Sequence, residues 1–354
     1  MTPATANPVH DVSGHCTEPE LTAPVDECTP DGTLNRAAVG WSRQPLHRCN
    51  LSGRWPRKKR WDYWCVTTDT HLLSLTYASI DYIGLVDAWA LDYATKAVVQ
   101  HGAYVPFGRG FALPETVGGG DMRFTSASFN LAILEETEGT RLRVDFRTRA
   151  GATLDADVLV TRPARHETLN VIIPWSDRCF QFTSKHNTRP AHGRMVVNGR
   201  AYAFGAENQA FGCLDYGRGI WPYRCVWNWA SASGVQNGRT VGLNLGGKWT
   251  DGTGMTENGL CIDGRLHKLS EELVFAYDRS NFMAPWRIRT PLSGRVDLTF
   301  VPFFEKAPTL NLLVLATDLH VCFGHFDGHV VTDEGERIEV RHLIGWAEEH
   351  RARW

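Results

Sequence analysis

The chain has 354 residues, and its 43% hydrophobic and 21% charged content are ordinary globular values that supply enough apolar material for a sizeable core. A formal net charge of −2 at pH 7 argues against a protein that binds nucleic acid by neutralising phosphates. No apolar run approaches the ~18 residues of a membrane span, and the N-terminus lacks the apolar core of a secretory signal. We therefore expect a cytoplasmic protein without an integral membrane segment.

The N-terminal segment, residues 1–35, is rich in Pro, Thr, Asp and Glu and shows no periodicity, which predicts an irregular lead-in. The nine Cys of the chain are scattered without a CxxC pair, so we expect reduced thiols rather than a disulfide framework. An early set of His and Cys has spacings that match no compact pair of zinc ligands, so zinc is the less favoured interpretation there. That set is His15, Cys16, Cys28, His47 and Cys49.

A basic run at residues 57–60, RKKR, leads directly into the aromatic sequence WDYW. One interpretation is a site that holds a phosphate or a carboxylate. The other, which we favour, is a solvated turn followed by a strand. On that strand, alternate residues place Trp61 and Tyr63 on one face and Asp62 and Trp64 on the other.

Beyond the lead-in, a period of two dominates the hydrophobic pattern. In RLRVDFRTR, apolar Leu142, Val144 and Phe146 share one face and charged residues share the other. Similar short runs, rich in Val, Ile, Phe and Thr, are separated by Gly, Asn and Asp turns, which indicates antiparallel all-β structure, either sandwich or barrel. TEGT, VNGR, IDGR, FDGH and DEGE have the composition of hairpin turns. Only GLVDAWALDYAT and the tail WAEEHRARW are helix-like.

A weak internal sequence repeat suggests that the chain has two similar halves. In each, a Trp-rich segment follows a basic or glycine turn, RKKRWDYWCV in the first and RGIWPYRCVWNWA in the second. The seam is expected within residues 178–190. This predicts two consecutive β-barrels, residues 36–185 and residues 186–354, because closed barrels leave no exposed edge strands.

The densest aromatic segment is GCLDYGRGIWPYRCVWNWASASG. Asp215 and Arg218 flank an expected Gly turn, and Trp227 and Trp229 share one face of an extended strand. A carboxyl group among aromatic rings loses solvation in its charged form, so its pKa rises and it can donate a proton near neutral pH. The alternative is that Asp215 pairs with Arg218 and that the tryptophans only fill the core.

The segment GGKWTDGTGMTENGL combines turn glycines with Trp249 and two carboxylates. Asp251 lies within the turn and is expected to cap it. Glu257 comes where a strand resumes, at the rim of a barrel, so Asp215 and Glu257 are predicted to face one cavity, either as acid and base or as acid and cation stabiliser. The alternative for Glu257 is a buried salt bridge to a nearby cation. The candidate cations are Arg218, Arg224 and Lys248.

Three histidines near the C-terminal end, His320, His325 and His329, invite a metal interpretation. On a strand His325 and His329 share a face and His320 does not, so a metal site is not favoured. No nucleophile elbow, phosphate loop, zinc-protease or dinucleotide-binding pattern occurs in the required structural context. We therefore expect no cofactor.

Six segments carry a resemblance to a known family: GWSRQPLHRCNLSG, RKKRWDYWCV, GCLDYGRGIWPYRCVWNW, GKWTDGTGMTENGLCIDGRLHKL, APWRIRT and GWAEEHRARW. Through them nearly the whole chain resembles the bacterial domain-of-unknown-function family numbered 2804, whose name implies no activity. More distantly, HGRMVVNGRAYAF and WNWASASG are similar to tandem lipocalin-like proteins, which include carotenoid 1,2-hydratase (hydroxyneurosporene synthase) and lipocalin-fold pericyclases. That similarity implies two lipocalin-like barrels with a ligand cavity at or between them, and a hydratase-type acid near LDYGRG or WNW.

We predict a cofactor-independent acid–base enzyme, a hydratase, cyclase or isomerase, that acts on a hydrophobic or amphipathic small molecule. Protonation of an alkene or leaving group needs a carboxylic acid that burial keeps neutral, and aromatic faces stabilise the cation that forms. Asp215 or Glu257 would donate the proton, and Arg218 would hold one carboxylate in place. The side chains expected around the substrate are Arg218, Trp221, Tyr223, Trp227, Trp229, Trp249, Trp61 and Tyr63.

Two other functions fit the same residues. A glycoside-active enzyme would use Asp215 and Glu257 as paired carboxylates, about 5–10 Å apart across an open cleft, with Trp platforms under the sugar rings. A lipocalin-like carrier would bind a lipid or pigment without catalysis, and both carboxylates would be engaged in structural pairs that point away from the cavity. The substrate and the oligomeric state are not determined by the sequence.

Overall fold

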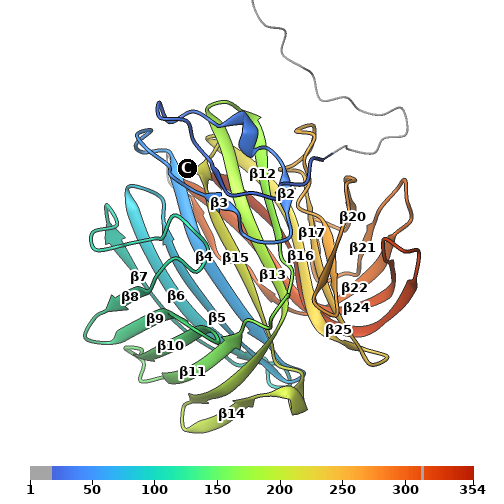
Figure 1. Cartoon of the computed structure of the whole chain (residues 1–354). Helices are drawn as coiled ribbons and strands as arrows, with labels where there is room; N and C mark the ends of the chain where they lie inside the picture. Colours follow the sequence, from blue (N-terminus) through green and yellow to red (C-terminus); the bar gives the residue numbers. More distant parts are fainter. Residues whose placement is uncertain (1–17, 312–314) are drawn as a thin grey trace, which may run out of the picture.

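The computed structural model describes residues 18–311 and 315–354. These residues form β-strands joined by turns, with two helices of three residues each, η1 (Arg36–Ala38) and η2 (Ala206–Asn208). The all-β prediction is confirmed, and Figure 1 shows two curled antiparallel sheets side by side. The first 17 residues of the predicted lead-in, which include His15 and Cys16, lie outside the described residues.

The first large sheet has thirteen strands, ten of which form one continuous hydrogen-bonded path. In spatial order the path is β7 (Val98–Pro106), β6 (Ile83–Asp92), β5 (His71–Ser79), β4 (Lys58–Thr67), β15 (Phe211–Ile220), β13 (Cys179–Val197), β11 (Thr153–Thr161), β10 (Gly139–Arg147), β9 (Phe129–Glu136) and β8 (Met122–Thr125). The strands beside the path are β12 (Leu169–Ser176), β14 (Arg200–Phe204) and β2 (Trp41–Ser42). Because β13 pairs with β15, β11, β12 and β14, it joins all parts of this sheet.

The second large sheet has ten strands. Its path is β19 (Arg265–Lys268), β18 (Gly259–Ile262), β17 (Arg239–Gly247), β16 (Arg224–Gln236), β25 (Arg337–Arg353), β24 (Ala316–Val331), β22 (Val296–Lys306), β21 (Trp286–Arg289) and β20 (Val274–Ala276), with β23 (Thr309–Asn311) paired to β24. A small parallel pair, β1 (Val25–Asp26) and β3 (His47–Arg48), completes the described strands.

The chain passes from the first sheet to the second between Ile220, the last residue of β15, and Arg224, the first residue of β16. The predicted boundary between residues 185 and 186 lies inside β13, next to a register shift that begins at His186. The residues that follow, up to Ile220, pair with the first sheet because β14 and β15 both hydrogen-bond to β13. The domain limits themselves stay a prediction.

Both helix predictions are wrong. GLVDAWALDYAT falls mostly in β6, and the tail WAEEHRARW falls in β25, which lies between β16 and β24. Apolar layers cover both faces of β25: Trp346 packs between the two sheets, and Ala347 packs in the core of the second sheet. A strand that is buried on both faces loses the period-two signal, so its pattern cannot be distinguished from that of a buried helix.

Four of the five predicted hairpin turns, TEGT, VNGR, IDGR and DEGE, are confirmed. VNGR and IDGR have positive φ at both central residues, as a two-residue hairpin turn requires. The prediction for FDGH is wrong, because this segment lies inside β24 at a register shift. Its Gly328 has φ 137°, and a side chain there would meet the carbonyl oxygen of Asp297 at 2.2 Å, so the glycine serves a bulge and not a turn.

Each sheet curls around its own apolar core, which includes Phe182 in the first sheet and Trp286 in the second. The opposite faces of the central strands meet each other, since β13 and β15 contact β16 and β17. Two further apolar clusters fill this space, which we call the inter-sheet layer. In Figure 1 these strands occupy the middle of the molecule.

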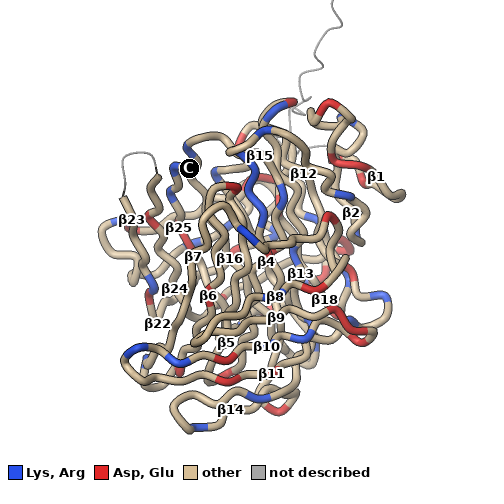
Figure 2. The backbone as a smooth tube through the Cα atoms, turned by 90° about the vertical axis from the view of Figure 1, so that its left-hand side faces the viewer, with Lys and Arg blue, Asp and Glu red and all other residues tan. Residues whose placement is uncertain are grey.

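No helix in the described part of the chain has the length and apolarity needed to cross a bilayer. Acidic and basic residues are interspersed along the strands and loops in Figure 2. The eight described cysteines are free thiols, as their scattered spacing predicted, and most of them are buried.

Candidate functional site

The inter-sheet layer holds an ion cluster built on Lys185 of β13. Its Nζ atom lies 2.8 Å from Oδ1 of Asp215 and 3.2 Å from Oε2 of Glu257. The side chains of Lys185, Asp215 and Glu257 are only 5%, 13% and 2% exposed. Lys185 and Asp215 are partners in the register of β13 and β15, so they project from the same face, whereas Glu257 reaches them from the loop before β18. The structure thus brings both predicted carboxylates together, with an ammonium group between them.

The glycine-rich loop before β18 holds Glu257 against Gly246. A Cβ atom on Gly246 would lie 2.2 Å from Oε1 of Glu257, so glycine leaves the room that the carboxylate occupies. On the loop side, Nε1 of Trp249 donates a hydrogen bond of 2.5 Å to the same oxygen. Asp251 instead accepts a 3.1 Å bond from the backbone N–H of Lys248, which confirms its predicted capping role. Trp249 and Glu257 therefore belong to the ion cluster, and Asp251 belongs to the turn.

Burial and mutual charge determine the protonation of this cluster. Burial alone would lower the pKa of the Lys185 ammonium, but the charges of Asp215 and Glu257 outweigh it and raise that pKa, so the lysine stays charged. Burial raises the pKa of Glu257, and Lys185 offsets part of this shift. When both carboxylates are ionised, one ammonium leaves an excess negative charge in a poorly solvated space.

A third carboxyl group, that of Glu348 on β25, lies within the field of these charges. Its Oε1 accepts a 2.9 Å hydrogen bond from Nε1 of Trp227. Burial raises the pKa of Glu348 to about 7; the Trp227 bond and the Lys185 ammonium oppose this shift, and the negative charges of Asp215 and Glu257 add to it. The side chain is half-buried and keeps contact with solvent. Near neutral pH a substantial fraction of Glu348 is thus a carboxylic acid that can donate a proton.

Tryptophan rings gather beside these carboxyl groups. The ring of Trp221 stacks on Trp249 with centroids 5.4 Å apart and planes at 12°, and it contacts Trp227 at 5.5 Å and Trp61 at 5.7 Å. Gly217 makes room for this packing, because a Cβ atom there would lie 2.2 Å from the Trp61 ring. Six rings form what we call the tryptophan cluster: Trp61, Trp175, Trp221, Trp227, Trp249 and Trp354.

Two more predicted residues lie on the other side of the ammonium. The ring of Trp229 lies under Lys185, with Nζ 4.3 Å from its centroid. Tyr63 meets the edge of Trp229 at a centroid distance of 6.0 Å. Trp61, Tyr63 and Trp227 are half-buried, so the layer keeps some aromatic surface exposed near Glu348.

Two predicted substrate-contacting residues do not join this group. The expected Gly turn between Asp215 and Arg218 is wrong, because both lie in the continuous strand β15, three residues apart and hence on opposite faces. Arg218 does not reach Asp215; its Nη2 lies 2.7 Å from Oδ1 of Asp62. Tyr223 is 39% exposed, and the Cζ atom of Arg57 lies 6.0 Å over its ring.

Lys185 and Glu348 are absent from the sequence predictions. Lys185 lies in the segment interpreted as a seam, and Glu348 lies in the tail interpreted as a helix. A strand interpretation of the tail would have placed Trp346, Glu348 and His350 on one face, which is a carboxyl group between aromatic neighbours. The pairing of Lys185 with two carboxylates has no such local signal, because Asp215 and Glu257 come from distant parts of the chain.

The two metal interpretations gain no support from the described residues, among which no three His, Cys, Asp or Glu side chains are grouped to hold an ion. Nδ1 of His320 lies 2.6 Å from Glu305, and His325 stacks on His342 at 3.5 Å. Nε2 of His47 lies 2.9 Å from the carbonyl oxygen of Ala38. Cys28 and Cys49 are buried in the apolar core of the first sheet, so these three residues have structural roles.

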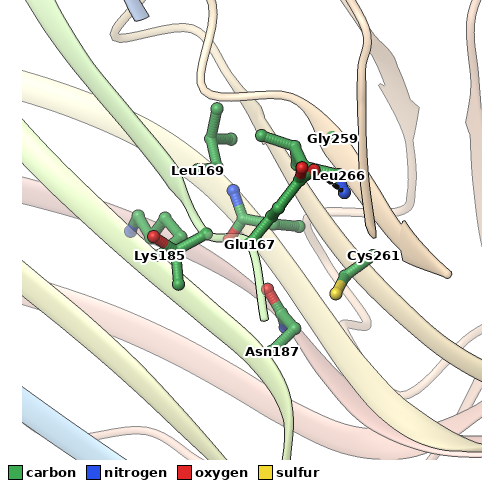
Figure 3. Close-up of a pocket in the computed structure, with 9 residues that line it drawn as sticks. Glu167, Leu169, Lys185, Asn187, Gly259, Cys261 and Leu266 are labelled. Carbon is green, nitrogen blue, oxygen red and sulfur yellow. Dashed lines mark hydrogen bonds between the residues drawn. The ribbon is translucent and has the colours of Figure 1, made fainter. Parts of the chain in front are cut away.

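A cavity of ≈ 10 Å³ adjoins the stem of Lys185, and Figure 3 shows it between β13 and β18. The backbone N–H of Leu266 donates a 2.7 Å bond to Glu167 at its edge, and Cys261 lines it. Its volume suits about one water molecule and not a substrate. A second cavity, of ≈ 410 Å³, lies elsewhere among mostly charged side chains: Arg239, Ile262, Asp263, Arg265, His267, Thr332, Glu334 and Glu336. Tryptophan lines neither of these two cavities.

The model of the family named Domain of unknown function (DUF2804) matches residues 18–354, so the chain belongs to this family. The predicted resemblance is confirmed. No curated protein matches the sequence.

Two solved structures are similar over nearly their whole length. An AttH-like protein of Nitrosomonas europaea is 12% identical, with 93% of this chain and 98% of that chain covered and a TM-score of 0.49. Kievitone hydratase from Nectria haematococca is 11% identical, with 96% and 98% covered and a TM-score of 0.47. At these values neither similarity carries an argument about this chain.

Proposed function

We propose that this member of the DUF2804 family is an acid–base enzyme of the hydratase, cyclase or isomerase type, without a dissociable cofactor, in which Glu348 is the proton donor. One observation supports this most: Asp215 and Glu257 share a single ammonium, Lys185, and a third buried carboxyl group, Glu348, lies within the field of these charges beside the tryptophan cluster. Burial, reinforced by the negative charges of Asp215 and Glu257, keeps the carboxyl group of Glu348 partly protonated near neutral pH. A hydrophobic or amphipathic small molecule would lie on the half-buried faces of Trp61 and Trp227.

In the proposed reaction, the carboxylic acid of Glu348 transfers its proton to an alkene carbon or to a leaving group of the substrate. A cation develops on the substrate, and the face of Trp227 stabilises it. The excess negative charge of Asp215 and Glu257 acts in the same direction, in a site where few solvent dipoles screen it. Glu348, now a carboxylate, then accepts a proton from an added water or from a neighbouring carbon, which restores the acid.

This proposal changes the roles predicted for Asp215 and Glu257. Both are ion-paired with Lys185, and Glu257 is almost fully buried, so neither is as well placed as Glu348 to meet a substrate. We assign them an electrostatic role: they add to the effect of burial, which raises the pKa of Glu348. Trp249, which binds Glu257, would fix their geometry.

The glycosidase alternative has less support. Lys185 occupies the space between Asp215 and Glu257, where a glycosidase needs a sugar and a water molecule. The carrier alternative keeps one specific observation in its favour, because both carboxylates are engaged in pairs, as that alternative expects. In that case the tryptophan cluster would bind a ligand without converting it.

To test the proposal, the purified protein is incubated with a lipid and metabolite extract and the mixture is analysed by mass spectrometry. The wild type is expected to convert at least one compound into a product of equal mass or of a mass changed by one water. Glu348→Gln should lower the rate about 100-fold or more, because it removes the general acid.

Asp215→Asn and Glu257→Gln serve as matched controls, since each removes one carboxylate and leaves Glu348 in place. They should lower the pH at which activity is half-maximal and retain measurable turnover, because they remove negative charge near Glu348. Unchanged turnover in Glu348→Gln would remove this residue as the donor. A compound that co-purifies with every variant and is never converted would support the carrier instead.

A further inference from the structure

Lys59, in the basic run RKKR, is a buried cation with no ion-pair partner among residues 18–311 and 315–354. Its side chain is 0% exposed, and among the described residues its Nζ atom has no hydrogen-bond acceptor. Asp81, whose charge acts on Lys59, already has two other partners: it lies 3.5 Å from Lys58 and 3.5 Å from Arg60. Lys59 is thus the one member of these three that the fold leaves uncompensated.

Lys59 faces the same inter-sheet layer as the candidate site. It lies opposite Gly219 in the register of β4 and β15, two residues before Trp61 and therefore on the same face. Its Nζ atom lies 5.5 Å from the ring centroid of Trp354 and 4.9 Å from that of Tyr82. Lys59 consequently borders the tryptophan cluster.

The ring that covers Lys59 connects it to the proposed acid. Trp354 lies 6.0 Å from Trp227, whose indole N–H binds Glu348. Among the described residues the indole N–H of Trp354 makes no hydrogen bond, and its ring packs against Trp221 and Trp227. An ammonium and a carboxyl group therefore both border the tryptophan cluster.

A buried ammonium without a counter-ion is unfavourable, and aromatic faces offset only part of the lost solvation. Burial lowers the pKa of Lys59 to about 8, with Asp81 opposing this shift and Arg57 reinforcing it. The group is still mostly protonated at neutral pH. A buried polar group that the fold leaves unsatisfied calls for an explanation outside the fold, such as a ligand.

We propose that Lys59 is an anion subsite, which binds the acidic group of a substrate or ligand whose apolar part lies on the tryptophan cluster. That this molecule is a substrate rests on the proposed function. The class of molecule expected is an amphipathic organic acid with a carboxylate or a similar oxyanion. The acidic group would take the place of the Trp354 ring beside the ammonium. An ion pair formed in this dry position would be stronger than one at the surface.

Two fluorescent probes of nearly the same ring system test this subsite: anilinonaphthalene sulfonate, which is anionic, and phenyl naphthylamine, which is neutral. Wild-type protein is expected to bind the anionic probe on the order of tenfold more tightly, the factor expected for one charge-assisted contact. Lys59→Met should abolish this preference and leave the Kd of the neutral probe unchanged, which also shows that the variant is folded. Lys58→Met, in the same basic run but paired with Asp81, should keep the preference.

Equal binding of the two probes by the wild type, no binding of either, or a preference that survives in Lys59→Met would overturn the proposal. The outcome is independent of catalysis. Glu348→Gln should keep the probe preference, so a failure of the acid–base proposal and a failure of the anion subsite are distinguishable.

Discussion

Two buried lysines face the same inter-sheet layer, and their surroundings differ. Lys185 on β13 and Lys59 on β4 flank the central strand β15. Lys185 has two carboxylate partners, which raise its pKa against the effect of burial, whereas Lys59 has none in the described part of the chain and burial lowers its pKa to about 8. The first lysine links the two sheets, and the second retains an unused charge. A buried charge is thus a structural element or a binding element according to whether the fold itself supplies its counter-ion.

The largest expected effect is on the paired lysine. Lys185→Met should lower the free energy of unfolding by about 3–5 kcal/mol, because it leaves Asp215 and Glu257 buried and uncompensated. Urea denaturation measures this change.

The triple variant Lys185→Met, Asp215→Asn, Glu257→Gln is the control, since it removes every charge of the cluster. It should recover most of the lost stability, because no unpaired ion remains. A triple variant no more stable than Lys185→Met would show that the single substitution acts through packing and not through charge.

The next effect is the dependence of stability on pH that comes from Glu348, near the Lys185 ion cluster. Glu348 has an ordinary pKa of 4.5 when unfolded and about 7 when folded, so between these values the folded state binds more protons. Stability from this group is present below about pH 4.5 and is lost as the pH rises through about 7, by about 2–3 kcal/mol in all. Glu348→Gln should remove this loss, as measured by unfolding at about pH 5 and about pH 7.5.

The adjacent Glu349 provides a matched comparison on the opposite face of β25. Burial would raise its pKa, but bonds from Lys248, Tyr277 and Arg351 outweigh this and lower the pKa to about 2. Its contribution to stability is therefore lost only as the pH falls below about 4.5. Glu349→Gln should leave the decline between about pH 5 and about pH 7.5 intact; a flattened decline would mean that Glu348 is not its source.

The smallest effect is on the unpaired lysine, and it has the opposite sign. Lys59→Met should raise the free energy of unfolding by about 1 kcal/mol below about pH 8, because an apolar side chain of similar length replaces an uncompensated ammonium. The gain should shrink as the pH rises from about 8 toward 10.5, where Lys59 loses its proton in both states.

Lys58→Met is the control, since Lys58 is paired with Asp81 and should give no gain. Thermal unfolding of the two variants side by side measures the difference. A loss of stability in Lys59→Met would show that Lys59, like Lys185, stabilises the folded protein.

Much of the layer was predictable from residue types. The proximity of Asp215 and Glu257, and of Trp61, Trp221, Trp227 and Trp249, follows from treating the two aromatic segments as parts of one site. Glu348 was missed because β25 is buried on both faces, which removes the alternation that identifies a strand. Arg218 was misplaced for a local reason: a glycine between it and Asp215 indicated a turn, whereas Gly217 makes room for the Trp61 ring.

The sequence by itself determined the all-β class, most of the hairpin turns and the family, because these depend on periodicity, turn chemistry and extended motifs. Only the tertiary structure decided which charges meet. Lys185, Asp215 and Glu257 come from a strand, a second strand and a loop, and the packing of two sheets brings them within hydrogen-bonding distance or close to it. The same packing gives Lys59 no carboxylate partner from the residues that the structure describes. A lysine in a sequence is only a cation; its partners, and hence its role, are fixed by long-range pairing that no local pattern encodes.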